Sequence, residues 1–254
     1  MTRSRVLTAL GWLAALSALC TLWEMAARNR VLNPFLIGQP TEIGARLHEW
    51  IADGSIWSNM LLTFAEVAAG FAAATVAGVL IGVWLGSSPA ARQVVTPFLV
   101  FFNAVPRLIL GPFFVIWLGF GITPKIVFVI FVIVFIVAVN VMSGMREVPR
   151  ELVSHVRVLG GRRRDVVVRV YLPSIAFWLL AGARATVGYA FSAAIIAEFV
   201  GSNHGLGYLL SAGQSSLDVN TTWAALAVVM VAAIAVDRGL AGVHRRISPW
   251  LRVA

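Results

Sequence analysis

The feature that constrains this chain most is the segment from Ile126 to Met145, which runs for 20 residues without a charged side chain. An α-helix of about 20 residues is about 30 Å long, which matches the hydrocarbon thickness of a bilayer. The β-branched residues of the segment would also suit a buried strand, but its length and its lack of turn residues favour a helix. A helix also satisfies its own backbone hydrogen bonds, as the bilayer interior requires. We therefore predict a membrane-spanning helix here.

Five other apolar segments are long enough to cross a bilayer. They are Val6–Trp23, about Ile56–Leu85, Val94–Gly121, Ser174–Ala197 and Val219–Val236. The segment Val94–Gly121 is the least regular, because it contains Pro97, Pro106 and Pro112 and carries Arg107. Since 59% of the 254 residues are hydrophobic and only 12% are charged, the polar surface is too small to cover a soluble globule. The sequence predicts an all-α membrane protein with six transmembrane helices.

The first apolar segment has the outline of a secretory signal, because it follows Arg3 and Arg5. Its uncharged run is longer than a typical signal core and no small-x-small cleavage site follows, so we expect a retained helix. Leu19 stands where a lipoprotein signal has a small residue, so we expect Cys20 to be an ordinary apolar side chain. We expect residues 1–55 to hold the first helix and an outer segment, and residues 56–250 to form the core of a single transmembrane domain.

The distribution of basic residues predicts the orientation in the membrane. Six spans put both termini on the same side, and placing them inside gives the cytoplasmic segments fourteen arginines, against Arg28, Arg30, Arg46 and Lys125 outside. Cytoplasmic loops carry an excess of Lys and Arg, so we predict cytoplasmic N- and C-termini. The net charge of +9 then reflects topology, and we expect no nucleic-acid partner.

A basic island lies between the fourth and fifth predicted spans, with the sequence ELVSHVRVLGGRRRDVVVRVYLP from Glu151 to Pro173. Pro149 suits a helix start and the glycine pair after Leu159 suits a stop, which predicts a short helix of residues 149–159. Its apolar side chains at i, i+4 and i+7 share one face. These are Leu152, Val156 and Leu159, with Ser154 and Arg157 away from them. We expect a second helical stretch from Arg162, and a turn back into the membrane at Leu172–Pro173.

Charge alone leaves two interpretations of the island open, because a solvated loop that only fixes topology would look the same. The spacing adds a resemblance. The segment resembles the EAA loop of the permease subunits of binding-protein-dependent ABC importers, which has Glu-Ala-Ala, three residues, Gly, nine residues and then Ile-x-Leu-Pro. Here Gly160 is followed by nine residues and then by Val170-Tyr171-Leu172-Pro173. The family's Glu-Ala-Ala falls on Ser154-His155-Val156, so its Glu is absent, and Glu151 lies one helical turn earlier.

The resemblance implies a role for the island. In the family this helix docks into a cleft on an ATPase subunit and transmits its closing to the membrane spans. The residues expected to couple to the ATPase are Glu151, Ser154, His155, Val156, Arg157, Gly160, Gly161, Leu172 and Pro173. The chain from about Ile56 nearly to the C-terminus also resembles the permeases of the nitrate, sulfonate and taurine group, through segments such as NAVPRLILGPFFVIWLGFG and AEFVGSNHGLGYLL.

The resemblance also implies partners. They are two ATP-binding subunits that bind ATP and Mg²⁺, a second copy of the permease, an extracytoplasmic solute-binding protein and the lipid of a bacterial cytoplasmic membrane. The chain itself has no Gly-Lys-Ser/Thr loop, so we expect a non-catalytic subunit. One cysteine cannot form an intramolecular disulfide, and four histidines without ligand spacing predict no metal or other cofactor in the chain.

Two arginines within predicted spans suggest a substrate pathway, because an arginine at mid-membrane costs about 2.5–3.5 kcal/mol and usually faces a cavity or a partner. Arg107 and Arg184 would suit an anion, although both would also be explained by free carbonyls near prolines or by snorkelling. The candidate pathway residues are Phe102, Asn103, Arg107, Arg184, Tyr189 and Ser192. Glu198, with Gly205 and Gly207 in the loop that follows, is a candidate outer gate, where it either caps backbone amides or contacts a binding protein.

Our hypothesis is therefore the permease subunit of an ATP-driven importer for a small organic or inorganic anion. The first alternative is a stand-alone secondary transporter or channel. Coupling to protons or sodium would need intramembrane carboxylates, and the only candidates, Glu66 and Glu198, lie toward the ends of their spans. The second alternative is a membrane scaffold whose basic loop binds anionic lipid or RNA. Gly160→Trp separates the importer from the scaffold, because only docking on an ATPase requires a bare turn there.

Overall fold

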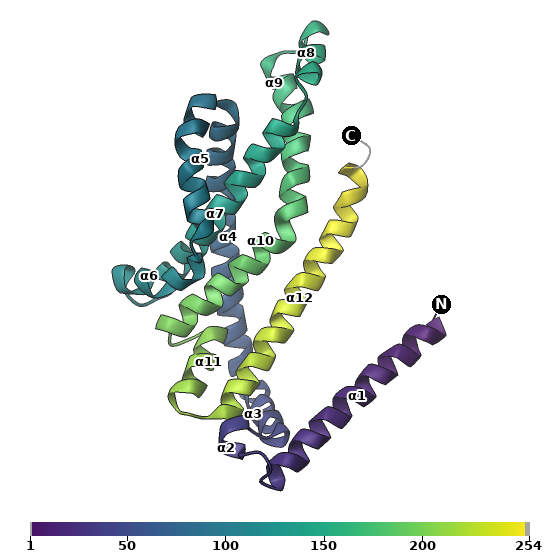
Figure 1. Ribbon diagram of the computed structural model, residues 1–254, viewed down its shortest axis with the longest axis vertical. Coiled ribbons are helices and arrows are strands. Elements are labelled where there is room, and N and C mark those ends of the chain that lie inside the picture. Colours follow the sequence, from purple (N-terminus) through teal and green to yellow (C-terminus); the bar gives the residue numbers. More distant parts are fainter. Residues whose placement is uncertain (1, 252–254) are drawn as a thin grey trace.

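The structure, a computed structural model, describes residues 2–251, without the side chains of residues 2–10, 13, 103 and 243–251. Its elements within these residues are helical (Figure 1). They are α1 (Thr2–Arg28), α2 (Pro34–Ile37), α3 (Pro40–Ala52), α4 (Ser55–Ser87), α5 (Pro89–Ala104), the 3-10 segment η1 (Arg107–Leu110), α6 (Gly111–Leu118), α7 (Ile122–Glu147), α8 (Arg150–Val158), α9 (Arg163–Val166), the π-helical segment η2 (Val167–Tyr171), α10 (Leu172–Gly201), α11 (Leu206–Ser215) and α12 (Val219–Leu251).

Four of the predicted spans are long, apolar helices. They are α4, α7, the continuous run Arg163–Gly201 and the part Val219–Gly242 of α12. The predicted third span is different, because α5 and the η1–α6 pair meet at a bend of 80°. Val105 is extended there, with φ −74° and ψ 130°, since the residue before a proline avoids the helical region, and α5 therefore ends before Pro106. The first predicted span lies in one uninterrupted helix, α1, and a total of six spans stays a prediction.

The helices alternate in direction. In Figure 1 the end of α4, the end of α7, the beginning of α10 and the end of α12 lie toward the upper side, whereas α2, α3 and α11 gather at the lower side. This alternation agrees with the predicted order of the spans. The assignment of the upper side to the cytoplasm rests on the arginines and stays a prediction.

The most extensive contact between two helices is that of α4 with α7, and glycines allow the two backbones to approach. An added Cβ at Gly78 would lie 2.6 Å from the Cβ of Val137 and 2.9 Å from the carbonyl oxygen of Val134. The same relation recurs at intervals of four or eight residues along both helices. The facing pairs are Gly70–Val129, Gly78–Val137, Gly82–Val141 and Gly86–Met145. Small residues allow this approach, which is how helices associate in lipid, where no hydrophobic force acts between them.

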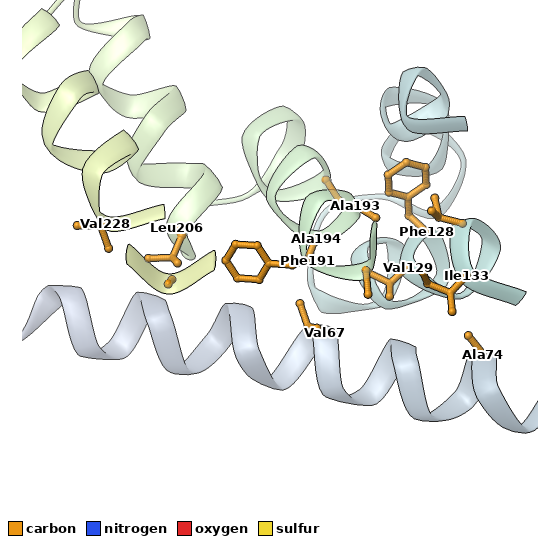
Figure 2. Packing of buried hydrophobic residues seen from close by; sticks show 14 of the residues in the cluster. Val67, Ala74, Phe128, Val129, Ile133, Phe191, Ala193, Ala194, Leu206 and Val228 are labelled. Carbon is orange, nitrogen blue, oxygen red and sulfur yellow. The ribbon is translucent and has the colours of Figure 1, made fainter. Parts of the chain in front are cut away.

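The rest of the core is built on this pair. Figure 2 shows Phe191 and Ala194 of α10 and Leu206 of α11 lying over α4 near Val67, with Val228 of α12 beside them. All of these side chains are buried. Alanines at the centre of α10 bring its backbone close to its neighbours, so α4, α7, α10, α11 and the first turns of α12 form one body.

The end of the molecule opposite α8 is closed by α3. Trp50 of α3 is buried in the core, and the amide of Gln39 donates to Oδ1 of Asn220 at 2.8 Å. Arg46 forms an ion pair with Asp218, with 3.2 Å between Nη2 and Oδ2, at the start of α12. The Thr221 hydroxyl and amide, which donate to Asp218, and the Arg46 guanidinium hold the pKa of Asp218 below its ordinary value of 3.8. These contacts connect α3 firmly to the first turn of α12.

Candidate functional site

The predicted short helix of the basic island is present as α8, Arg150–Val158. It begins after Pro149, as expected of a residue that has extended backbone and no donor to lose. It ends because Gly160 adopts φ +81°, which lets the amide of Gly161 donate to the carbonyl of Val156 at 2.8 Å. No side chain or backbone lies within 4 Å of the position a Cβ would take at Gly160. Figure 1 shows α8 and α9 at one extreme end of the molecule.

The apolar face predicted for α8 does not join the core. It lines a groove of about 730 Å³ between α8 and the beginning of α10. The lining includes Leu152, His155 and Val156 of α8 and Leu159, which follows it, together with Pro173 and Phe177 of α10. Leu159 is 86% exposed and Val158 is 84% exposed. Exposed apolar side chains next to an open groove are typical of an interaction surface.

The polar positions of α8 are exposed as well. Glu151, Ser154 and Arg157 face away from the groove residues, and His155 is exposed at the edge of the groove. Glu151 lies in the first turn, where a carboxylate is favoured by the helix dipole.

The return into the membrane differs from the expectation at Leu172–Pro173. The chain does not turn there, because α9, η2 and α10 form one continuous helical run from Arg163. Pro173 has no amide hydrogen and its ring would clash with the carbonyl of Arg169, so the backbone widens into a π-helix at Val167–Tyr171 instead of breaking. Asp165 starts the run by accepting from the amide of Arg162 at 2.8 Å. The turn that reverses the chain is Gly160–Gly161 alone.

Two contacts fix the base of this hairpin. The hydroxyl of Ser174 donates to the carbonyl of Gly144 at 2.6 Å, and the indole of Trp178 donates to the carboxylate of Glu147. An added Cβ at Gly144 would lie 3.0 Å from the Cα of Ile175, so α7 and α10 touch backbone to backbone here. The ends of α7 and α10 therefore hold α8 on a rigid support.

The bend between α5 and η1 creates a cavity of about 350 Å³. Arg107 and Tyr189, two of the predicted pathway residues, both line it, together with Pro106, Val132 and Ile136. Nη1 of Arg107 donates to the carbonyl of Val132 at 2.8 Å. The cavity therefore brings a permanently charged guanidinium together with a tyrosine and apolar side chains.

The other predicted pathway residues lie elsewhere. Phe102 stacks on Phe135 of α7 with 5.1 Å between ring centroids, so it packs between helices. The side chain of Asn103 lies outside the described residues. Arg184 and Ser192 line a separate groove of about 200 Å³ between α10 and α12. The sequence therefore predicted one pathway set, and the structure divides its described members among two cavities and a packing contact.

Arg184 has a partner that the sequence analysis missed. Two of its three donor nitrogens, Nε and Nη2, donate to the carboxylate of Asp237 in α12, with 2.5 Å between Nη2 and Oδ2. A forked arginine–carboxylate contact of this kind is geometrically specific. The pairing of two charges within adjacent spans is the signal that could have suggested it, since an isolated charge in a span is costly.

Glu198 shows the first of the two contacts considered for it. Its Oε2 accepts from the amide of Gly207 at 2.7 Å, and its Oε1 accepts from the hydroxyl of Thr63 at 2.6 Å. Gly205 has φ +107°, and an added Cβ there would lie 2.3 Å from the Glu198 carboxyl carbon, so this turn requires glycine. Glu198 is fully buried.

Lys125 was predicted to lie on the outer side of the membrane, and the structure places it inside the protein. It is 3% exposed, and its Nζ lies 2.5 Å from Oε1 of Glu66. The sequence analysis treated Glu66 only as a possible ion-coupling group. The signal that could have predicted this pair is the only lysine of the chain, Lys125, at the start of one span and a carboxylate, Glu66, within another, because charges in membrane spans usually pair with each other.

Comparisons with known proteins show what the chain is similar to. The family model described as "Binding-protein-dependent transport system inner membrane component" matches residues 74–249. The taurine transport system permease protein TauC of Escherichia coli (strain K12) is 26% identical over 243 residues, which cover 94% of this chain and 88% of TauC. The putative aliphatic sulfonates transport permease protein SsuC of Bacillus subtilis (strain 168) is 25% identical, with the same coverage.

A third relative and a solved structure complete the comparison. The formylaminopyrimidine transport permease protein ThiX of Halalkalibacterium halodurans is 25% identical and covers 91% of this chain and 92% of its own length. An inward-facing structure of the MetNI methionine ABC transporter matches with a TM-score of 0.60 at 20% identity, over 79% of this chain and 97% of that chain. At this identity the structural match shows that the two chains share a fold.

Proposed function

Because this chain belongs to the family of binding-protein-dependent transport system inner membrane components, and is thus an ABC transporter permease, we propose that it imports a small organic or inorganic anion. The exposed position of α8 at one end of the molecule suits a membrane component that works with separate partners. We propose that these are two ATP-binding subunits, a second copy of the permease and an extracytoplasmic solute-binding protein, and that the complex lies in a bacterial inner membrane.

The observation that carries the proposal is the exposed helix α8 beside its apolar groove. A short helix at the end of a helical hairpin, with Leu159 and Val158 exposed, is a surface to which another protein can bind. We propose that the ATPase binds α8 and that its ATP-driven closure moves the hairpin. ATP and Mg²⁺ would be bound by that partner, because the chain has no phosphate-binding loop of the Gly-Lys-Ser/Thr type.

The cavity at the bend supports an anion as cargo. Arg107 carries a permanent positive charge within the membrane-spanning region, and Tyr189 adds a hydroxyl to the same cavity. The names of the relatives include a taurine and an aliphatic sulfonate permease, whose cargoes carry a sulfonate group, but also a formylaminopyrimidine permease. We therefore propose a sulfonate, nitrate-like anion or aromatic carboxylate as cargo, with Arg107 as the charged contact.

Purification of the chain with its natural partners tests the proposal. We expect a mild-detergent pull-down from native membranes to recover an ABC-type ATPase and a secreted or lipid-anchored binding protein, with ATP hydrolysis in the eluate. If the binding protein is recovered, ligand screening on it would identify the cargo. Recovery of the chain alone, without ATPase activity, would favour the stand-alone transporter.

A matched pair of variants tests the docking surface. Gly160→Trp and Gly54→Trp both place a large side chain at a positive φ, +81° and +79°, where nothing lies within 4 Å of the added Cβ. Gly54 has ψ 0°, in the left-handed helical region, and Gly160 closes α8 with the turn that is typical of that region. Each substitution therefore costs on the order of 1–2 kcal/mol in backbone strain. We expect only Gly160→Trp to reduce the recovery of the ATPase and to uncouple hydrolysis from uptake. Equal recovery of the ATPase with both variants would contradict the proposed dock.

A further inference from the structure

A cluster of buried polar side chains lies where α11 begins. It is defined by Asn59, Thr63 and Glu66 of α4, Lys125 of α7 and Glu198 of α10. The most exposed member, Asn59, is only 7% exposed, and Thr63, Glu66 and Glu198 are fully buried. Neither the coupling surface nor the cavity at the bend includes any of the five. The proposed transport function therefore leaves this cluster unexplained.

The charges of the cluster do not balance when every group has its ordinary form. Two carboxyl groups face one ammonium group, because Lys125 is the one basic side chain within 4.0 Å of either carboxyl in the described part of the chain. His204, the nearest titratable group along the following loop, is exposed and contacts Ser202 and Tyr208 instead. An uncompensated charge buried in protein and lipid is costly, so the cluster favours a state with one negative charge fewer.

The hydrogen bonds point to the same missing proton. Oε1 of Glu66 accepts from Lys125, but its Oε2 is buried and has no donor among the described residues. Thr63, which donates to Glu198, lies one helical turn before Glu66 on α4, which brings the two carboxyl groups near enough for their charges to act on each other. One proton held between the two carboxyl groups gives the orphaned oxygen a hydrogen bond, and it turns a repulsive contact into an attractive one. The same proton leaves Lys125 and one carboxylate as a neutral pair.

The cluster also holds the outer loop. The amides of Gly205, Leu206 and Gly207, at the N-terminal end of α11, donate to Oδ1 of Asn59 at 2.6 Å, Oγ1 of Thr63 at 3.0 Å and Oε2 of Glu198 at 2.7 Å. These are the amides that a helix cannot satisfy within itself. Side chains from α4 and α10 thus replace a local cap, and the beginning of α11 is tied to both helices.

We propose that Glu66 and Glu198 hold one proton between them at neutral pH, and that this proton-bearing cluster is a latch that fixes the start of α11 to α4 and α10. Loss of the proton leaves two facing carboxylates against one lysine. The repulsion is relieved when Glu198 moves away from Glu66 and releases the amide of Gly207. Opening of the loop and release of the proton are then one event, which does not depend on the identity of the cargo or of the partners.

Infrared spectroscopy of the full chain in lipid nanodiscs tests the proton directly. We expect a protonated-carboxyl C=O band at neutral pH that is removed by Glu66→Gln and also by Glu198→Gln. A nitroxide label at position 204, introduced as His204→Cys in a Cys20→Ser background, reports the loop. We expect the label to become mobile in wild type at the alkaline pH at which the band disappears, and to stay immobile there in both glutamine variants.

Stability separates the shared proton from a merely structural role. Each single glutamine supplies a neutral partner and leaves one carboxylate for Lys125, so we expect thermal unfolding close to wild type. The double variant Glu66→Gln/Glu198→Gln leaves Lys125 without a counter-ion, and we expect it to unfold at a clearly lower temperature. Glu49→Gln, an exposed carboxylate variant, serves as the control. Absence of a band that either single variant removes, or single variants as unstable as the double, would overturn the proposal.

Discussion

The close contact between α4 and α7 gives a prediction that can be worked out from distances. Gly78→Ala adds one methyl group, whose carbon would lie 2.6 Å from the Cβ of Val137 and 2.9 Å from the carbonyl oxygen of Val134. Neither neighbour can move by changing a rotamer, because one is a Cβ and the other is backbone. The two helices must therefore separate locally, and we expect the buried contacts on both sides of Gly78 to weaken.

The expected size follows from two opposing effects. Replacing a helical glycine by alanine stabilises a helix by about 0.8–1.0 kcal/mol. Overpacking a tight contact costs about 1–3 kcal/mol. Gly239→Ala isolates the first effect, because Gly239 is in the interior of α12 with nothing within 4 Å of the added Cβ. We therefore expect Gly78→Ala to be less stable than Gly239→Ala by about 1–3 kcal/mol in the free energy of unfolding.

Gly86→Ala is a third variant, with an intermediate degree of steric conflict. An added Cβ at Gly86 would meet the Sδ of Met145 at 2.6 Å, but that atom belongs to a flexible side chain that can move aside. Gly86→Ala should therefore fall between the other two. Unfolding by SDS in mixed micelles, followed by far-UV circular dichroism, measures all three. Equal shifts for Gly78→Ala and Gly239→Ala would refute the reasoning, because the close contact would then carry no packing constraint.

Three further predictions concern other contacts. The carboxylate of Asp218 has a depressed pKa in the folded protein, so it stabilises the fold above its ordinary value of 3.8, and this contribution is lost as the pH falls through the lower folded pKa; thermal unfolding followed from about pH 6 to about pH 3 should show an acid limb that Asp218→Asn flattens. A double-mutant cycle of Arg184→Gln and Asp237→Asn should give a favourable coupling energy, and a value near zero would mean that the pair seen between α10 and α12 is not formed in the membrane. Pro173→Ala restores an amide donor to the widened turn, so we expect amide hydrogen–deuterium exchange at Val167–Tyr171 to become slower than in wild type. An unchanged exchange rate would mean that the proline does not cause the π-helix.

The sequence predicted most of the long helices because their signals are local. The uncharged segment Ile126–Met145 lies within α7, and Pro149 and Gly160 bound α8 nearly where the helix was expected. Predicting the position of such a helix requires only the length of an apolar segment or the conformational preference of one residue. The family resemblance was confirmed by the match over residues 74–249.

Features that depend on distant residues were not predictable in the same way. Lys125 and Glu66 are 59 residues apart in the chain, and Arg184 and Asp237 are 53 apart, so no spacing rule connects them. The expected turn at Leu172–Pro173 was wrong because a helix can absorb a proline by widening, and the outcome depends on the support that α7 gives to α10. The 80° bend after α5 likewise exceeds what the three prolines alone indicate.

The uninterrupted helix α10 carries Pro173 at one end and Glu198 near the other, a distance of about 38 Å along a helix of this rise. Because α10 is one continuous helix, a displacement of its end near α8 would reach the loop before α11 along the backbone hydrogen bonds of a single element. Those hydrogen bonds depend little on which side chains the helix carries. Substitutions on the surface of α10 can therefore adapt the lining to a new cargo while the two ends of the transporter stay in step.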